Sequence, residues 1–192
     1  PDYSFYSELP FVAVKLTDGC PFSCTYCASK LLSPSLIKRD PQAFADELES
    51  YALRGVKNAA FYDDALLFDR EHFKKTLKII IEKKLALNFQ VPNGLHASYL
   101  DADIALLMKK AGFQSPNISL ETTDRSMQSA TGGKVTNENF LRAVESLKNA
   151  GFEAGEIGVY MLAGLPGQAY DSVMRDVEFV KKTGAKIRLS TW

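Results

Sequence analysis

Cysteine is almost absent from this sequence of 192 residues: the three that it contains, Cys20, Cys24 and Cys27, lie within one stretch of eight residues. A network of disulfides across the fold is therefore excluded. The hydrophobic share of 46% is enough for a chain of this length to bury a core without covalent cross-links. An odd, clustered set of thiols in such a chain indicates metal or redox chemistry in a reducing compartment, and we expect a cytoplasmic protein.

Long apolar segments and a charge imbalance are also missing. No run of about 18 apolar residues occurs, and the N-terminal sequence PDYSFYSELP lacks the basic and then apolar order of a signal peptide. Lysine plus arginine and aspartate plus glutamate both number 23, so no broad attraction to nucleic acid or anionic lipid is expected. We predict one domain over residues 1–192, without a membrane or nucleic-acid partner. Because the chain begins with Pro1 and ends in strand-like sequence, we expect it to be part of a longer protein.

What the sequence does contain is a series of short apolar runs that alternate with amphipathic stretches. The runs cover residues 11–16, 59–62, 87–91, 117–120, 157–162 and 186–190. They are apolar on consecutive residues rather than on alternate ones, which is typical of parallel strands covered on both faces. Leu162, in the fifth run, is expected in the core.

The intervening stretches carry start and stop signals of helices. Helix starts are predicted at four N-cap residues, Asp40 (which precedes Pro41), Asp69, Asp101 and Thr136. Helix ends in a left-handed conformation are predicted at Gly55, Gly112, Gly151 and Gly184. Six such strand-helix units favour an α/β fold of the partial, TIM-like (βα)6 barrel type, with a doubly wound open sheet as the alternative. In either fold ligands collect at the carboxyl ends of the parallel strands, and the cysteines directly follow the first of these strands.

Three cysteines in the pattern Cys-x-x-x-Cys-x-x-Cys suit few kinds of metal site. A structural zinc site requires a fourth protein ligand, for which only His72 and His96 remain. A ferredoxin-type cluster is short of one cysteine. The count suits a 4Fe-4S cluster with one iron open to a substrate. A zinc-stabilised domain and an iron-sulfur module that serves electron transfer or binding alone remain as alternatives.

This motif, with the aromatic Tyr26 before its last cysteine and its place after the first strand, resembles that of the radical S-adenosylmethionine (SAM) superfamily. The resemblance implies an enzyme in which Cys20, Cys24 and Cys27 hold a 4Fe-4S cluster and the open iron chelates the amino and carboxylate groups of SAM. It implies reductive cleavage of SAM to a 5′-deoxyadenosyl radical that acts on a substrate. A reductant such as flavodoxin or ferredoxin is implied as a partner.

The resemblance covers nearly the whole chain and implies SAM contacts at the tips of later strands. The sequence Tyr62-Asp63-Asp64 stands where the family has an element that accepts hydrogen bonds from the SAM amine. The sequence Gly164-Leu165-Pro166-Gly167 resembles the element whose backbone lies close to the adenine of SAM. The residues expected to bind SAM are Tyr26, Tyr62, Asp63, Asp64, Asn93, Ser119, Glu121, Lys134, Ala163, Gly164 and Arg188. Several have structural alternatives: turns or helix caps for the acidic residues, and a solvent-exposed edge for Arg188.

Within this superfamily, the paired aspartates and Asn93-Gly94 resemble the branch that contains cobalamin-dependent enzymes and methylthiotransferases. That branch implies that cobalamin can bind in a domain that this chain does not contain. Because its members act on many different molecules, the sequence does not identify the substrate.

Overall fold

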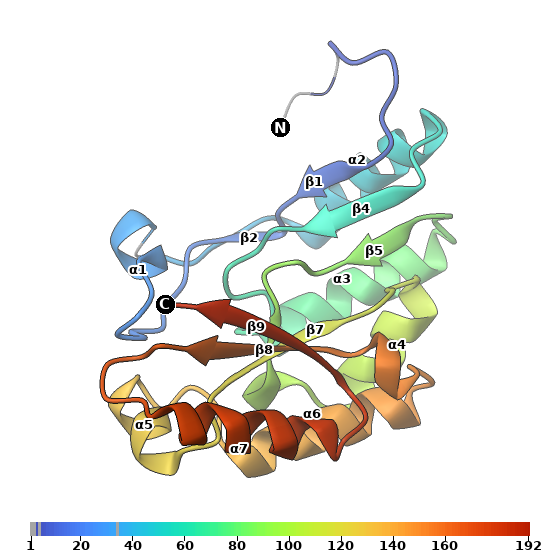
Figure 1. The fold of residues 1–192 in the computed structure, drawn as a ribbon. Helices are drawn as coiled ribbons and strands as arrows, with labels where there is room; N and C mark the ends of the chain where they lie inside the picture. The colour runs from blue at the N-terminus through green and yellow to red at the C-terminus, as the bar shows by residue number, and fades with distance from the viewer. Residues whose placement is uncertain (1–2, 4, 34) are drawn as a thin grey trace.

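The computed structural model describes residues 3, 5–33 and 35–192 and has an α/β fold in which parallel strands alternate with helices (Figure 1). All six predicted strands are present: β1 (Val12–Val14), β4 (Asn58–Phe61), β5 (Asn88–Gln90), β7 (Asn117–Glu121), β8 (Gly158–Ala163) and β9 (Lys186–Thr191). Every pairing among these six strands is parallel. Their carboxyl ends therefore point to the same side of the molecule, where the segment containing the cysteines lies (Figure 1).

The strands form two sheets rather than one, because the chain changes partner between β5 and a further short strand, β6 (Leu95–His96). One sheet has the order β1-β4-β5 and the other the order β6-β7-β8-β9. Between them, the Asn117 side chain donates to the Val91 carbonyl at 3.1 Å and the Tyr160 hydroxyl to the Pro92 carbonyl at 2.6 Å. Side-chain hydrogen bonds thus connect the two sheets at the place where backbone pairing between strands stops. The result agrees with the predicted partial barrel, with β1 and β9 at its two ends.

A small antiparallel pair that the sequence analysis did not predict encloses the cysteine segment. Strands β2 (Thr17–Asp18) and β3 (Ile37–Lys38) pair at its two ends, and a short helix, α1 (Ser29–Leu32), lies between them. Gly19 leaves β2 with a φ of +87°, and a Cβ at this position would lie 2.2 Å from the Ser35 carbonyl oxygen. Only glycine fits at this point, where the chain turns into the cysteine loop.

Helices pack on the outer side of the sheets. They are α2 (Pro41–Leu53), α3 (Arg70–Glu82), α4 (Ala102–Ala111), α5 (Arg125–Ala130), α6 (Asn137–Asn149) and α7 (Tyr170–Lys181), with the short 3-10 turns η1 (Ala97–Tyr99) and η2 (Ala154–Glu156). The four predicted N-caps are confirmed, since the side chains of Asp40, Asp69, Asp101 and Thr136 each accept a hydrogen bond from the backbone of the first helical turn. The four predicted glycines all have positive φ angles, between +79° and +100°.

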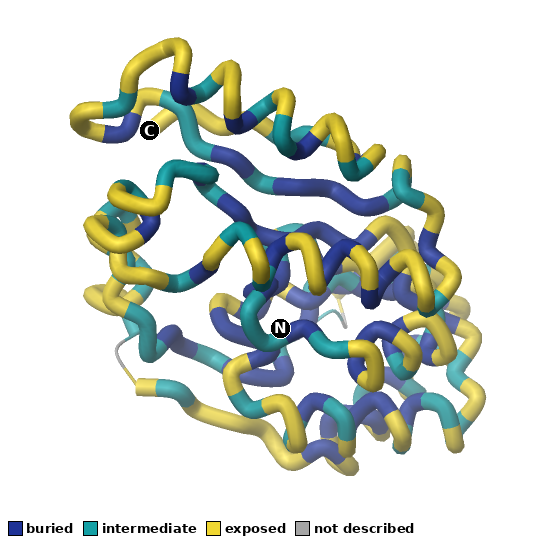
Figure 2. Tube along the Cα trace, turned by 90° about the horizontal axis from the view of Figure 1, so that it is seen from below, coloured by how far each residue is buried: buried dark blue, intermediate teal, exposed yellow. Residues whose placement is uncertain are grey.

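The core lies between the helices and the sheets, and exposed residues lie on the outer sides of the helices (Figure 2). Its centre is aromatic: the Phe61 ring centroid lies 5.5 Å from that of Phe89 and 5.4 Å from that of Phe113, within the range of favourable aromatic contacts. This packing fixes β4 and β5, whose carboxyl ends lead into the site. Within the described part of the chain, no helix is long and apolar enough to cross a membrane.

Candidate functional site

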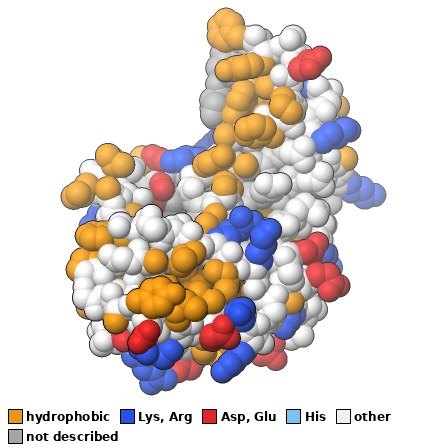
Figure 3. Space-filling view, viewed as in Figure 1, with side chains coloured by type: hydrophobic (Ala, Val, Ile, Leu, Met, Phe, Trp, Pro, Cys, Tyr) orange, Lys and Arg blue, Asp and Glu red, His pale blue; other side chains and the backbone are white. Residues whose placement is uncertain are grey.

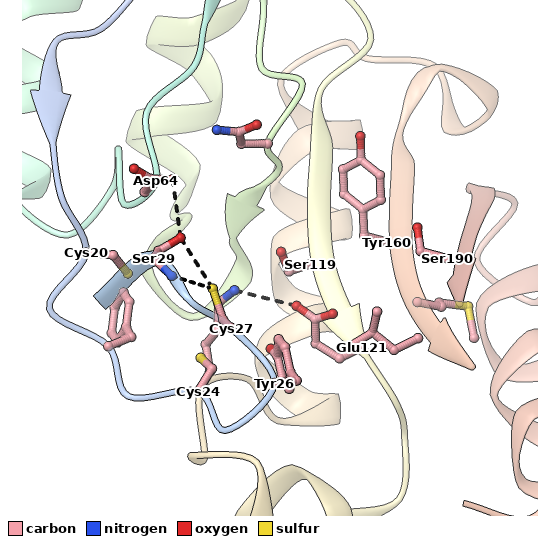
Figure 4. Close-up of a pocket in the computed structure, with 15 residues that line it drawn as sticks. Cys20, Cys24, Tyr26, Cys27, Ser29, Asp64, Ser119, Glu121, Tyr160 and Ser190 are labelled. Carbon is pink, nitrogen blue, oxygen red and sulfur yellow. Dashed lines mark hydrogen bonds and ion pairs between the residues drawn. The ribbon is translucent and has the colours of Figure 1, made fainter. Parts of the chain in front are cut away.

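A cavity of about 370 Å³ lies at the carboxyl ends of the strands (Figure 4). Residues from the cysteine segment, from the loops after β4 and β5, and from β7, β8 and β9 line it. They are Cys20, Phe22, Cys24, Tyr26, Cys27, Ser29, Asp64, Asn93, Ser119, Glu121, Lys134, Tyr160, Met161, Leu162 and Ser190. The cavity thus combines thiols, both signs of charge and three aromatic rings within one space.

All three cysteines are free and line this cavity. The Cys20 side chain is buried, and burial raises the pKa of its thiol. The loop is fixed by main-chain hydrogen bonds, from Cys27 N–H to the Cys24 carbonyl at 3.1 Å and from Thr25 N–H to the Thr131 carbonyl at 3.4 Å. The Ser29 N–H donates to the Cys27 Sγ at 3.5 Å. The thiols are therefore presented by an ordered loop.

The donor set fits a cluster of several metal ions better than a single ion. No three Cys, His, Asp or Glu side chains in the described residues come close enough together to hold one metal ion. Three thiols that share a cavity without converging on one point suit a centre in which each thiolate binds a different iron.

His96 offers no support for the alternative of a zinc site. Its imidazole is buried against Phe22 and Tyr99, with ring centroids 4.5 and 4.8 Å away. Burial and the nearby Lys134 lower its pKa to about 3, so it is neutral. Both of its ring nitrogens are buried without a hydrogen-bond partner in the described part of the chain. His72, the other histidine, lies on helix α3 and does not line the cavity.

Glu121 and Lys134 form an ion pair in the cavity wall, with Oε1 and Nζ 3.5 Å apart. Glu121 has a φ of +70°, and the Thr122 N–H donates to the Leu120 carbonyl at 2.9 Å across it. This strained γ-turn coincides with a register shift between β7 and β8. A non-glycine residue held in this conformation is frequent at functional sites. The turn places the carboxylate in the cavity instead of continuing the strand.

Tyr26 lies beside this ion pair. Burial, and then the neighbouring Glu121 and Cys24, raise the pKa of its phenol, so the hydroxyl keeps its proton. Asn93 donates to the Tyr62 carbonyl at 3.0 Å and to the Asp63 carbonyl at 3.3 Å, which ties the end of β4 to the turn after β5.

The structure brings together six of the eleven predicted SAM-binding residues and places the other five outside the cavity. Tyr26, Asp64, Asn93, Ser119, Glu121 and Lys134 line the cavity, as do the three cysteines, whereas Tyr62, Asp63, Ala163, Gly164 and Arg188 do not. The Asp63 side chain instead accepts hydrogen bonds from Leu16 and Thr17, and the Gly164 N–H donates to Gln168.

Several lining residues were not predicted. Phe22, Ser29, Tyr160, Met161 and Ser190 line the cavity, and Leu162, expected in the core, is half-buried in its wall. The alternation of a strand could have indicated part of this set, because Tyr160 and Leu162 share a face of β8. Ser29 follows the motif as an ordinary loop residue and carries no such indication.

The chain was compared with known proteins. The family model described as the radical SAM superfamily matches residues 14–180. An uncharacterized methyltransferase of Pyrococcus horikoshii is 23% identical over 177 residues, which cover 91% of this chain and 37% of that protein. The ribosomal protein methylthiotransferase RimO of Pseudothermotoga lettingae is 25% identical over 194 residues, which cover 92% of this chain and 44% of that protein.

Among solved structures, the radical SAM methyltransferase TsrM from Kitasatospora setae, with cobalamin and a 4Fe-4S cluster bound, has a TM-score of 0.85 at 21% identity. The match covers 94% of this chain and 36% of that one. Coproporphyrinogen III oxidase from Escherichia coli has a TM-score of 0.69 at 13% identity and is covered to 45%. These two likenesses concern the fold. The chain spans less than half the length of each of these four proteins.

Proposed function

The chain belongs to the radical SAM superfamily, whose members bind a 4Fe-4S cluster and cleave SAM, and on this premise we propose that residues 1–192 form a catalytic core of that kind. Cys20, Cys24 and Cys27 are the proposed ligands of the cluster. When bound, the cluster supplies the electron that cleaves SAM to a 5′-deoxyadenosyl radical. The comparisons offer no support for an electron-transfer module without SAM cleavage.

One observation carries the proposal: the three cysteines of the chain line the same cavity as a partly buried pair of opposite charges. SAM carries an amino group and a carboxylate on one carbon. The Glu121 carboxylate can accept from the amine and the Lys134 ammonium can donate to the carboxylate, so the pair matches both groups. Their side chains are only 13% and 21% exposed, which strengthens these contacts relative to those at an open surface.

A low-potential electron donor is part of the proposal. Cys27 is the exposed member of the three thiols, so the cluster would lie near the surface on its side. Flavodoxin or ferredoxin is the proposed class of donor, and the cytoplasm, where free thiols persist, is the proposed compartment.

The reaction of the whole protein is proposed only by class. Relatives of known name include methyltransferases and methylthiotransferases, so we place transfer of a methyl or methylthio group first. Cobalamin, which is bound in TsrM, would then bind outside the residues described here.

The deciding experiment is anaerobic reconstitution of this chain with iron and sulfide, followed by dithionite and SAM. About four irons per chain together with 5′-deoxyadenosine are expected. Four irons without 5′-deoxyadenosine would contradict SAM cleavage by this core. Zinc without iron would contradict the proposed ligands.

Replacing Glu121 or Lys134 with alanine is expected to weaken SAM binding while the iron content stays unchanged. Each change removes one charge-assisted hydrogen bond, so the Kd for SAM should rise about 10-fold or more. Titration of the reconstituted protein with SAM measures the effect. The matched control is Glu178→Ala, which removes an exposed carboxylate on α7. An unchanged Kd in Glu121→Ala would remove this residue from the SAM site.

A further inference from the structure

Arg188 lies on the inner face of the strands, below the cavity. It pairs with Tyr160 in the register of β8 and β9, so the two side chains share a face. Ser190, two residues later on the same face of β9, lines the cavity. Two residues of a strand span about 6.6 Å, so Arg188 lies about that far toward the amino ends of the strands. It is therefore adjacent to the proposed SAM site but not part of its wall.

A glycine provides the space that the Arg188 side chain occupies. A Cβ at Gly158 would lie 2.5 Å from the Arg188 Nε and 2.1 Å from the Asn117 Oδ1. The φ of Gly158 is not in the left-handed region, so the backbone conformation alone does not require glycine here. Any other residue would instead displace the arginine or the asparagine. Gly158 thus permits Arg188 to lie across β8 on the inner face.

The Nε–H of Arg188 lacks a hydrogen-bond partner within the described part of the chain. Its Nε is buried without a hydrogen bond, as is the Asn117 Oδ1, and no carboxylate of residues 3, 5–33 and 35–192 lies within 4.0 Å of it. Arg39, Arg70 and Arg125 each form an ion pair with an acidic side chain, and Arg54 and Arg142 donate to backbone carbonyls. Arg188 as a whole is half-buried and stays charged, and leaving its buried Nε–H without an acceptor is costly. The arrangement favours an anion as the missing partner.

Lys186 shares this face of β9 with Arg188, whereas the lining of a second cavity, on the first sheet, is uncharged. This second cavity, of about 480 Å³, lies against β1, β4 and β5 and reaches Pro92, whose carbonyl accepts from Tyr160. All of its lining residues are neutral: Pro10, Phe11, Asn58, Ala59, Ala60, Tyr62, Gln90 and Pro92. In Figure 3, basic atoms lie near the middle of this open face and most acidic side chains lie toward its margins. An anion near Arg188 would meet little repulsion from such surroundings.

From these observations we infer that Arg188 binds an oxyanion of the substrate, a carboxylate or a phosphate, at a site below the SAM cavity. The inference rests on the proposed function, because that function places SAM in the cavity above Arg188. A substrate whose oxyanion is bound by Arg188 could extend another of its atoms into that cavity. The planar guanidinium can donate two parallel hydrogen bonds to either oxyanion. The lining of the second cavity is uncharged, so the part of the substrate other than the oxyanion is expected to be neutral and partly apolar.

The anion site is tested first in the chain without cluster or SAM. The ¹⁵N-labelled protein is titrated with sodium phosphate and, separately, with sodium acetate, at an ionic strength held constant with chloride. The Arg188 Nε–H resonance, assigned by its loss in Arg188→Gln, is expected to shift in a saturable way. The exposed Arg175 on α7, assigned with Arg175→Gln, is the matched control and should not shift. Saturation by phosphate alone would identify a phosphate site, and saturation by acetate a carboxylate site. No saturable shift with either anion would overturn the inference.

A second measurement separates this site from the SAM site. Reconstituted Arg188→Gln is expected to bind SAM with a Kd within about 2-fold of that of the unsubstituted protein. Arg188→Lys keeps the charge but loses the two parallel N–H donors of the guanidinium, so it should bind the oxyanion at least about 10-fold more weakly. A 10-fold loss of SAM affinity in Arg188→Gln would place the residue in the SAM site and contradict the inference. If the unsubstituted chain does not assemble a cluster, the proposed function fails, while the anion titration still decides whether Arg188 binds an oxyanion.

Discussion

Replacing Cys24 with alanine is expected to abolish iron binding and 5′-deoxyadenosine formation together. The chain contains only three cysteines, and all three line one cavity, so no spare thiol can take the place of the lost ligand. Changes in residues that merely support a metal ligand cost about 10- to 100-fold in affinity or activity, so loss of a ligand itself should cost at least about 100-fold. Iron analysis and chromatography of the products after reconstitution measure both effects.

Thr25→Ala is the matched control for this change. Thr25 lies next to Cys24 and is exposed, and its contact with the Thr131 carbonyl is made by its backbone N–H, which alanine retains. This variant should keep about four irons and full SAM cleavage. If Cys24→Ala retained SAM cleavage, the assignment of the three cysteines as ligands would be wrong.

The strands and most helix ends could be predicted because they depend on local chemistry. Asp40 followed by Pro41 is an N-cap in almost any context, and Gly112 adopts a φ of +100° that few other residues tolerate. The cysteine spacing likewise carries its chemistry within eight residues. Such features need no knowledge of distant parts of the chain.

Features that depend on contacts between distant segments could not be predicted. The change of partner between β5 and β6 depends on Asn117 and Tyr160, which approach from strands 26 and 68 residues further along the chain. The ion pair of Glu121 with Lys134 depends on the γ-turn at Glu121, for which the sequence offers no glycine.

The two adjacent aspartates, Asp63 and Asp64, show what the alternation of side chains along a strand can predict. Asn58, Ala60 and Tyr62 are at least partly exposed on one face of β4, while Ala59 and Phe61 are buried. Continued alternation places Asp64 with the first group and Asp63 with the second. The structure agrees, since Asp64 lines the site and Asp63 is buried. From the family resemblance we prefer the backbone of Tyr62 and Asp63 for contact with SAM and expect Asp64 to be partly structural, so the resemblance does not predict which of the two side chains lines the cavity.

Asp63 joins the end of β4 to the end of β1, directly before the cysteine segment. Its Oδ1 accepts from the Thr17 N–H at 2.5 Å, the Thr17 hydroxyl at 2.8 Å and the Leu16 N–H at 3.1 Å. Its Oδ2 has one longer contact, 3.3 Å from the Leu16 N–H. One oxygen therefore satisfies three buried donors while the other is nearly free, so a neutral side chain with a single carbonyl oxygen could serve almost as well.

Asp63→Ala is expected to lower the free energy of unfolding by about 3 kcal/mol, because it leaves buried donors without an acceptor. At pH 4, where the Asp63 carboxyl of the folded protein is protonated, Asp63→Asn, whose carbonyl can replace Oδ1, should stay within about 1 kcal/mol of the unsubstituted protein. Urea unfolding measures both. The control is Asp64→Ala, whose contacts with Ser29 and Lys15 at 3.5 and 3.6 Å are long, and which should lose less than about 1 kcal/mol. Equal losses in the alanine and asparagine variants would contradict the role assigned to Oδ1.

The same arrangement predicts a dependence of stability on pH. Burial raises the pKa of Asp63 from its ordinary value of 3.8 to about 6, and the hydrogen bonds from Thr17 and Leu16 only partly oppose it. The folded state therefore holds this proton more tightly than the unfolded state, so the contribution of Asp63 to stability is largest below about pH 4 and decreases as the pH rises to about 6. The asparagine variant cannot ionise at this position and should lack that decrease. Urea unfolding at several pH values compares the two proteins, and their difference should change in favour of Asp63→Asn as the pH rises. A constant difference between pH 4 and pH 7 would show that Asp63 does not titrate in this range.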